Sequence, residues 1–218
     1  MTVALGERGV RGIVLDVEGT TTRVAFVYDV LFPYARSHLR DHLKEHIGGD
    51  DATREALAAR MESLMDRDVK DPGLKWLQGE IWERGYRDGT LRGEVFPDVP
   101  PAFSQWRAAG LEIAIYSSGS VLAQRLLFRT VPCGDLTPHI GHYFDTSVGP
   151  KQSPDSYRHI AGAMGLACGE LAFVSDSAAE LVAARLAGLL TMLCVRPGNA
   201  LQSPDGADVI QTFDEVLV

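Results

Sequence analysis

The chain has 218 residues, of which 45% are hydrophobic and 23% charged, a composition typical of a folded globular protein. Disordered, collagen-like and coiled-coil chains are excluded, and the length fits one large domain or a core of about 100 to 150 residues with an insertion. The net charge of −8 would repel a polyphosphate backbone, so we expect no nucleic acid partner.

The first predicted strand covers residues 12–16, where an apolar run places Asp16 at the carboxyl end. A tight turn containing Glu18 and Gly19 follows. Two carboxylates two residues apart beyond a strand can face one crevice, where one attacks or binds a metal and the other moves a proton. The alternative interpretation is that Asp16 caps a turn and Glu18 is solvated.

Between residues 21 and 97 the pattern changes to apolar residues at helical spacing, in three successive segments. Two apolar faces are predicted, one with Val27, Val30, Leu31 and Tyr34 and the next with Leu57, Met61, Leu64 and Met65. The third segment opens with the capping pair Asp71 and Pro72 and is predicted to end at Gly85. The insertion starts where a lid over the sheet's carboxyl-end crevice would start.

After the insertion, short apolar runs alternate with helical patterns, as in a parallel sheet wrapped by helices. Strands are predicted over 111–116, 171–175 and 190–195. Helices are predicted around Phe103 and Trp106 before Gly110, from the Ser153 cap and Pro154 to Met164, and over 178–187 before Gly188.

Four further side chains follow predicted strands or lie in adjacent loops, namely Ser117, Ser118, Lys151 and Asp176. Hydroxyls at a strand end and a flexible lysine suit phosphate oxygens, and a carboxylate there suits Mg²⁺. Taken singly, each has a plain alternative: a serine-rich turn, a solvated lysine, a helix N-cap. One sheet edge would bring them together with Asp16, which favours a shared site.

Histidines and cysteines give weaker signals. On one helix His38, His42 and His46 would stack at one face and invite zinc, but interleaved charges favour a solvated surface. His139 and His142 are predicted to lie in a loop. Cys133, Cys168 and Cys194 lack ligand spacing and are predicted to be small buried thiols.

We expect a cytoplasmic protein without membrane contact. The apolar stretches are too short to cross a bilayer, and charges interrupt residues 1–11, so no secretory signal is predicted there. Sequence motifs of dinucleotide, P-loop and serine-hydrolase sites do not occur. We expect a monomer that acts on a small phosphorylated molecule.

The order of these residues resembles the haloacid dehalogenase superfamily of phosphatases: an aspartate with a second acid two residues on, a strand-end serine, a lysine and a later aspartate. Within it the chain is similar to the acireductone synthase family, the enolase-phosphatases of methionine salvage. Most of the superfamily carries aspartate where this chain has Glu18. The matching segments are 15–22, 29–35, 116–120, 144–146, 148–151 and 195–199. Arg23 and Tyr28 stand where that family has proline and lysine, which bears on substrate preference.

The resemblance implies a role for each candidate residue. Asp16 would be the nucleophile and a ligand of one Mg²⁺ per subunit, and Asp176 a second ligand. Glu18 would be the acid–base residue, with its backbone carbonyl on the metal. Ser117, Ser118 and Lys151 would bind the substrate's phosphate and neighbouring oxygens.

These observations predict an α/β protein with a Rossmann-like core, residues 1–20 and 98–218, and an all-helical cap, residues 21–97. The resemblance implies conversion of 2,3-diketo-5-methylthiopentyl 1-phosphate to acireductone, by enolisation and then dephosphorylation through an aspartyl phosphate. Within the same scaffold, the alternative is a phosphatase or dehalogenase that acts on another small acid or phosphoester. From a different class, the alternative is a catalytically silent phosphoester-binding protein.

Overall fold

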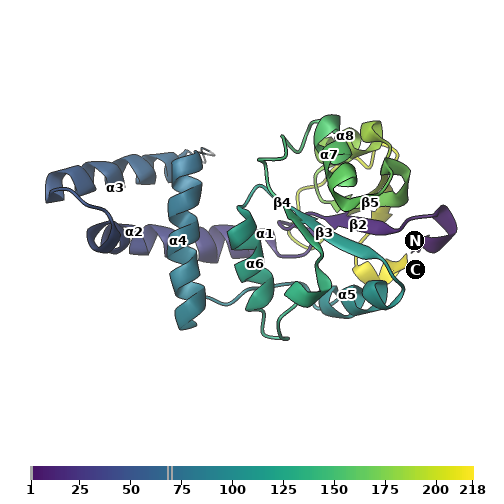
Figure 1. Ribbon diagram of the computed structural model, residues 1–218, viewed down its shortest axis with the longest axis horizontal. Helices are drawn as coiled ribbons and strands as arrows, with labels where there is room; N and C mark the ends of the chain where they lie inside the picture. The colour runs from purple at the N-terminus through teal and green to yellow at the C-terminus, as the bar shows by residue number, and fades with distance from the viewer. Residues whose placement is uncertain (1, 68, 70) are drawn as a thin grey trace. The chain divides into compact units, whose positions relative to one another are not determined.

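A computed structural model of the chain describes residues 2–67, 69 and 71–218. Its main feature is a six-stranded parallel sheet, which confirms the predicted α/β class (Figure 1). In spatial order the strands are β4 (His142–Phe144), β3 (Glu112–Tyr116), β2 (Gly12–Leu15), β5 (Leu171–Ser175), β6 (Leu190–Cys194) and β7 (Asp208–Ile210).

Helices cover both faces of this sheet (Figure 1). On one face, α7 (Pro154–Met164) and α8 (Ala178–Ala187) share a core with Val14, Ala114 and Phe173. On the other face, α5 (Val99–Ala108) supplies Phe103 and Trp106, whose rings contact Phe128 of α6 (Val121–Arg129) and Phe213. A strand buried on both faces reads as a continuous apolar run, which is why 12–16 and 171–175 are recognisable in the sequence.

Register aligns the carboxyl ends of the three central strands. Leu15 of β2 pairs with Ile115 of β3 and with Val174 of β5. The residues that follow each strand therefore lie along one edge of the sheet.

Several short elements carry no pattern long enough to predict. Strands β1 (Val3–Ala4) and β8 (Val216–Leu217) pair in parallel and hold the two ends of the chain together. Single helical turns occur at η1 (Gly6–Arg8), η3 (Thr137–His139), η4 (Cys168–Glu170) and η5 (Phe213–Glu215). None of the described helices is both long and apolar enough to cross a membrane.

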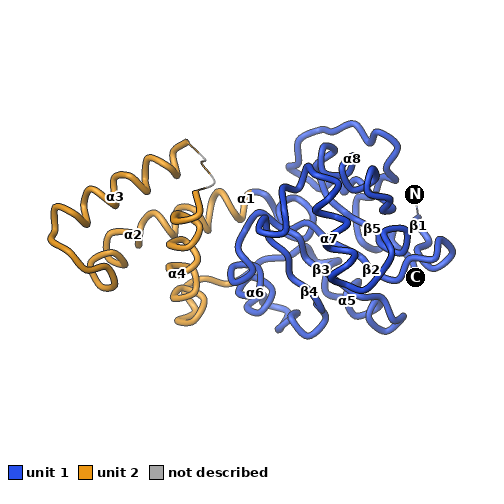
Figure 2. The backbone as a smooth tube through the Cα atoms, turned by 45° about the horizontal axis from the view of Figure 1, so that its top comes forward, with its two compact units in different colours: residues 1–24, 93–218 blue, residues 25–92 orange. Residues whose placement is uncertain are grey.

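The inserted segment is a helical unit of its own, residues 25–92 (Figure 2). Its elements are α1 (Val24–Phe26), a π-helical turn η2 (Val27–Leu31), α2 (Phe32–His46), α3 (Asp51–Asp66) and α4 (Pro72–Asp88). Asp50 and Asp71 cap α3 and α4 by accepting from the N–H groups of Thr53 and Leu74, at 2.7 and 3.0 Å.

Two predictions within this unit are wrong. The third helix does not end at Gly85 but continues to Asp88 and ends at Gly89, whose φ is +83°. Gly85 instead makes room inside the helix, since a Cβ there would lie 2.6 Å from Tyr34 Oη. Val30 is exposed rather than buried with Val27, because the π-helical turn has more residues per turn than an α-helix and rotates Val30 off the shared face.

The boundaries between the two compact units differ from the predicted boundaries at residues 21 and 97. The first unit comprises residues 1–24 and 93–218. Hydrogen bonds explain the difference: Thr22 Oγ1 donates to the carbonyl of Glu94 at 2.8 Å, and the N–H of Phe96 donates to the carbonyl of Thr21 at 2.9 Å. Residues 21–24 and 93–97 are thus bonded to each other within the first unit, and the inserted unit is correspondingly shorter than predicted.

Gly93 offers a stability test of how residues 93–97 pack within the first unit. A Cβ at Gly93 would lie 1.9 Å from the carbonyl oxygen of Leu127, a backbone atom that cannot rotate away. We expect Gly93→Ala to lower the free energy of unfolding by about 2 kcal/mol or more, the range of overpacking. Gly162→Ala is the matched control, because Gly162 lies in α7 with open space around it. Urea denaturation should show the control unchanged or stabilised by about 0.5–1 kcal/mol.

Candidate active site

Asp16 lies at the carboxyl end of β2 and is 5% exposed. Its Oδ1 accepts from the N–H of Val17 at 2.7 Å and from Lys151 Nζ at 2.6 Å. Its Oδ2 lies 3.2 Å from the hydroxyl of Ser175, the last residue of β5. These donors fix the carboxylate in one orientation at the edge of the sheet.

Lys151 binds two carboxylates at once. Its Nζ lies 2.6 Å from Asp16 and 2.7 Å from Glu180, with the lysine side chain 10% exposed. Burial alone would lower the pKa of Lys151, but the charges of Asp16 and Glu180 outweigh it and the pKa is raised. Lys151 therefore remains a cation in this site.

The loop that carries Lys151 is anchored through three successive carbonyl groups. Hydroxyls of Tyr116, Ser156 and Tyr157 donate to the carbonyls of Gly149, Pro150 and Lys151, at 2.9, 2.8 and 2.7 Å. Gly149 has a φ of +142°, and a Cβ there would lie 2.3 Å from Ser156 Oγ. The ammonium group is thus aimed by a rigid backbone.

Negative charge exceeds positive charge around this lysine. Burial, followed by the charge of Asp16, raises the pKa of Asp176 to about 6, and the charge of Glu18 acts in the same direction. Burial and Asp16 also raise the pKa of Glu180 to about 7, despite its ion pair with Lys151. The carboxylates near Lys151 outnumber its single ammonium group, an arrangement that favours binding of a further cation.

Gly19 leaves the space that the side chain of Asp176 occupies. The glycine has a φ of +71°, and a Cβ there would lie 2.3 Å from Asp176 Oδ2. The turn after β2 and the end of β5 can approach this closely only because position 19 has no side chain. Glu18, directly before it, is partly exposed.

Ser117 and Ser118 follow β3 at the same edge of the sheet. Ser117 is buried, and its Oγ accepts from the N–H of Gly119 at 3.1 Å. Ser118 is partly exposed. All six predicted site residues thus stand at the carboxyl ends of β2, β3 and β5 or in the loop before α7, and contacts or charge effects join Asp16, Lys151, Asp176 and Glu18 directly.

Sequence reasoning missed three residues that this site uses. Ser175 is apparent in the sequence only as a strand end, yet it bridges Asp16 and Glu180, at 3.2 and 3.1 Å. Arg196 and Asn199 contact the turn after β2 from a segment some 180 residues later. The sequence signal for Arg196 and Asn199 is their place in the matching segment 195–199, but no local pattern predicts which residues their side chains contact.

The histidines and cysteines lie in different surroundings from those that the sequence predicts. Over residues 2–67, 69 and 71–218, no three His, Cys, Asp or Glu side chains are arranged to hold a metal ion. His142 lies on β4 rather than in a loop, 3.3 Å from Glu112, and His42 is buried against His46 rather than solvated. Of the three cysteines predicted to be buried, only Cys194 is buried, whereas Cys168 is partly exposed and Cys133 is exposed.

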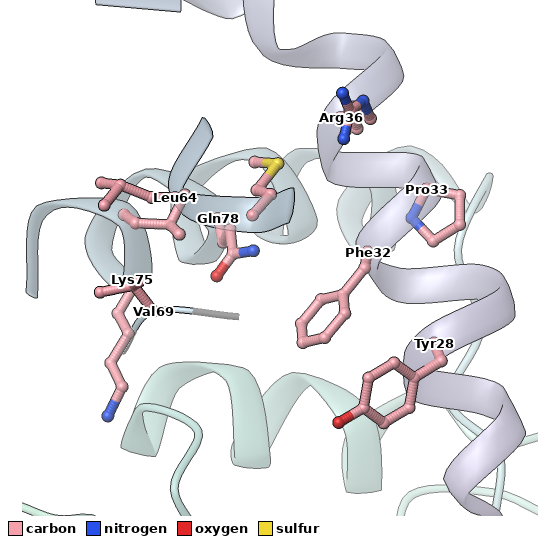
Figure 3. Close-up of a pocket in the computed structure, with 10 residues that line it drawn as sticks. Tyr28, Phe32, Pro33, Arg36, Leu64, Val69, Lys75 and Gln78 are labelled. Carbon is pink, nitrogen blue, oxygen red and sulfur yellow. The ribbon is translucent and has the colours of Figure 1, made fainter. Parts of the chain in front are cut away.

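The helical unit contains a separate cavity of about 230 Å³ (Figure 3). Tyr28, one of the two departures from the family pattern, lines it together with Phe32, and the two rings pack edge to face at 5.3 Å. The other lining residues are Pro33, Arg36, Leu64, Met65, Val69, Leu74, Lys75 and Gln78. Arg23, the second departure, donates to Glu94 at 2.7 Å.

Residues 10–188 match the model of the haloacid dehalogenase-like hydrolases. The chain belongs to this family. Enolase-phosphatase E1 of Pseudomonas aeruginosa strain UCBPP-PA14 is 44% identical to it, covering 96% of this chain and 99% of that protein. The protein of the same name from Drosophila yakuba is 41% identical and covers 91% and 88%. The crystal structure of UTR4 from Saccharomyces cerevisiae has a TM-score of 0.82 at 34% identity, covering 94% and 99%.

The resemblance found in the sequence is thus confirmed, and the family and relatives identify the chain as an enzyme of the phosphatase class. A haloacid dehalogenase phosphatase from Thermococcus onnurineus, with a TM-score of 0.65 and 21% identity, supports the fold alone.

Removing Lys151 should show how strongly this haloacid dehalogenase-like site depends on it. We expect Lys151→Met to cost about 3 kcal/mol or more of unfolding free energy, because Asp16 and Glu180 are left buried without the positive charge that they share. The loss should be smaller near pH 5 than near pH 8, since Glu180, whose pKa is raised to about 7 even beside Lys151, becomes neutral by binding a proton as the pH falls.

The control is Lys151→Met combined with Glu180→Gln, which removes one of the two stranded charges. Chemical denaturation at both pH values should show that this double variant regains part of the stability but none of the activity. Equal stability of the two variants at pH 8 would mean that the shared ammonium is not what holds the site.

Proposed function

We propose that this phosphatase is an enolase-phosphatase that converts 2,3-diketo-5-methylthiopentyl 1-phosphate to acireductone, a reaction of methionine salvage. The observation that carries the proposal is the buried carboxylate of Asp16, oriented by Lys151 and Ser175 and followed two residues later by Glu18. The name of relatives at 41% and 44% identity, enolase-phosphatase E1, supports the combination of an enolase and a phosphatase activity.

We also propose that one Mg²⁺ binds between Asp16, Asp176 and the backbone carbonyl of Glu18. The residues fit this ion: the donors are all oxygens, Gly19 leaves the space that Asp176 occupies, and the surrounding carboxylates exceed the cations. Two side chains suffice because Mg²⁺ keeps several waters. When bound, the ion would neutralise charge on the phosphoryl group.

The proposed phosphate chemistry runs through Asp16. Its carboxylate attacks phosphorus, the bond between phosphorus and the oxygen on carbon 1 breaks, and an aspartyl phosphate forms. Glu18 gives its proton to the departing oxygen and then takes one from the water that hydrolyses the aspartyl phosphate. Lys151, Ser117 and Ser118 bind the phosphoryl oxygens.

Enolisation precedes this step in the proposal. A proton leaves carbon 1 and the oxygen on carbon 2 gains one, so that the double bond forms between these carbons. Glu18 is the candidate for the proton transfer, because glutamate extends one methylene further than aspartate from the same turn.

Enolisation should be separable from dephosphorylation. In deuterated water, the wild-type enzyme given the diketo phosphate should show exchange at carbon 1 and enol absorbance before free phosphate appears. Asp16→Asn should release phosphate at least about 10³-fold more slowly, because an amide is a poor nucleophile. Phosphate released with neither enol signature would identify a simple phosphatase that acts on another class of phosphoester.

Asp176→Asn should separate stability from activity. Without divalent cations the variant should be more stable by on the order of 1 kcal/mol, because a partly buried carboxylate is removed from beside Asp16 and Glu18. It should lose most of its activity and the rise in melting temperature that Mg²⁺ gives the wild type. A wild type that keeps full activity in a chelator would refute the proposed metal.

A further inference from the structure

The segment after β6, residues 195–199, contacts the catalytic loop, which we define as residues 16–22. Asn199 Nδ2 donates to the carbonyl of Gly19 at 2.8 Å and lies 3.4 Å from the carbonyl of Cys194. Arg196 Nε donates to the carbonyl of Thr20 at 3.2 Å. Neither side chain has a part in the chemistry proposed above.

Arg196 is itself rigidly held. Its side chain is 3% exposed, its Nη1 donates to the carbonyl of Gln211 at 2.9 Å, and its Nη2 lies 2.8 Å from Asp98. The guanidinium lies over the rings of Phe96 and Phe213, 4.3 and 4.9 Å from their centres. A buried guanidinium held by a backbone carbonyl, a carboxylate and two aromatic rings can fix the carbonyl that it binds.

The catalytic loop uses its own N–H groups internally. Those of Thr20, Thr21 and Thr22 all donate to the carbonyl of Val17, at 3.2, 3.0 and 2.9 Å, and that of Gly19 donates to Thr22. The carbonyls that point outward are held by groups from outside the loop: Gly19 by Asn199, Thr20 by Arg196 and Thr21 by the N–H of Phe96.

Three successive peptide groups, the first of which joins Gly19 to Thr20, are therefore fixed from outside the loop. Gly19 lies between two side chains, since a Cβ there would be 2.3 Å from Asp176 Oδ2 and 3.1 Å from Asn199 Nδ2. Glycine is the most permissive residue of the turn, so the contacts from Asn199 and Arg196 add to the loop's internal hydrogen bonds in fixing the backbone beside Glu18.

We propose that Arg196 and Asn199 are positioning residues that hold the Gly19 and Thr20 carbonyls and thereby aim the Glu18 carboxyl at the departing oxygen. This inference rests on the proposed function of Glu18 as the acid. Neither residue touches the substrate; they act on the step in which a proton is transferred.

Leaving-group dependence tests the inference. An alkyl oxygen needs a proton to depart, whereas p-nitrophenolate leaves without one. We expect Asn199→Ala to lower kcat for the diketo phosphate and for a simple alkyl phosphate by about 10- to 100-fold, with little change in KM. Hydrolysis of p-nitrophenyl phosphate should fall by no more than about 3-fold, because its leaving group needs little acid catalysis. Arg196→Lys, which keeps the charge beside Asp98, should give an intermediate loss.

Arg107→Ala is the matched control for stability, because Arg107 also donates to a backbone carbonyl, that of Leu111, at the opposite end of β3. It should leave the ratio of the two rates unchanged. Equal losses for both leaving groups in Asn199→Ala would indicate a smaller folded fraction and overturn the inference.

A double-mutant cycle on the diketo phosphate gives a second readout, for which p-nitrophenyl phosphate is not needed. If Asn199 acts through Glu18, Asn199→Ala should have no further effect in a Glu18→Gln background. Independent effects that multiply would overturn the inference. If Glu18→Gln itself leaves alkyl phosphate hydrolysis intact, the acid role of Glu18 fails; if only Asn199→Ala is silent, the inference alone fails.

Discussion

A single buried ammonium group, that of Lys151, makes the active edge of this sheet possible. In the proposed mechanism Asp16 attacks a desolvated phosphoryl group from a buried position, and a buried carboxylate is costly without a cation. Lys151 stabilises Asp16 and Glu180 together at 2.6 and 2.7 Å. So much charge in one small volume needs further support. Hydroxyl groups hold the loop that carries Lys151, Ser175 bridges the two carboxylates, and Gly19 leaves space for Asp176.

The loop that carries Lys151 and the catalytic loop are held by the same kind of contact. Both the lysine loop and the catalytic loop present successive carbonyl groups, and side chains or N–H groups from elsewhere in the core hold each of them. A carbonyl fixed in this way fixes the peptide plane, and hence the side chain beside it. Backbone restraint therefore adds to the side-chain contacts of Lys151 and Asp16 in determining where the candidate groups point.

Much of this architecture is predictable from sequence because its signals are local. The apolar runs before Asp16 and Asp176 identify central strands, and the rule that parallel strands end at one edge groups the candidate residues. What cannot be predicted lies in long-range contacts: Asn199 reaches Gly19 across 180 positions. Strands of two or three residues, such as β1 and β4, have no periodicity to detect, and the π-helical turn shifts Val30 because sequence patterns assume an α-helical period.

The fastening of Thr21 and Thr22 to Phe96 and Glu94 has a consequence for how such enzymes diversify. The core itself brings the two ends of the inserted chain together, so the entropy of closing that long loop is offset by bonds the insertion does not supply. Any segment inserted between Thr22 and Glu94 begins and ends at residues that these bonds already hold together. The inserted segment can therefore be exchanged, lengthened or shortened while the first unit, residues 1–24 and 93–218, keeps the hydrogen bonds that close it.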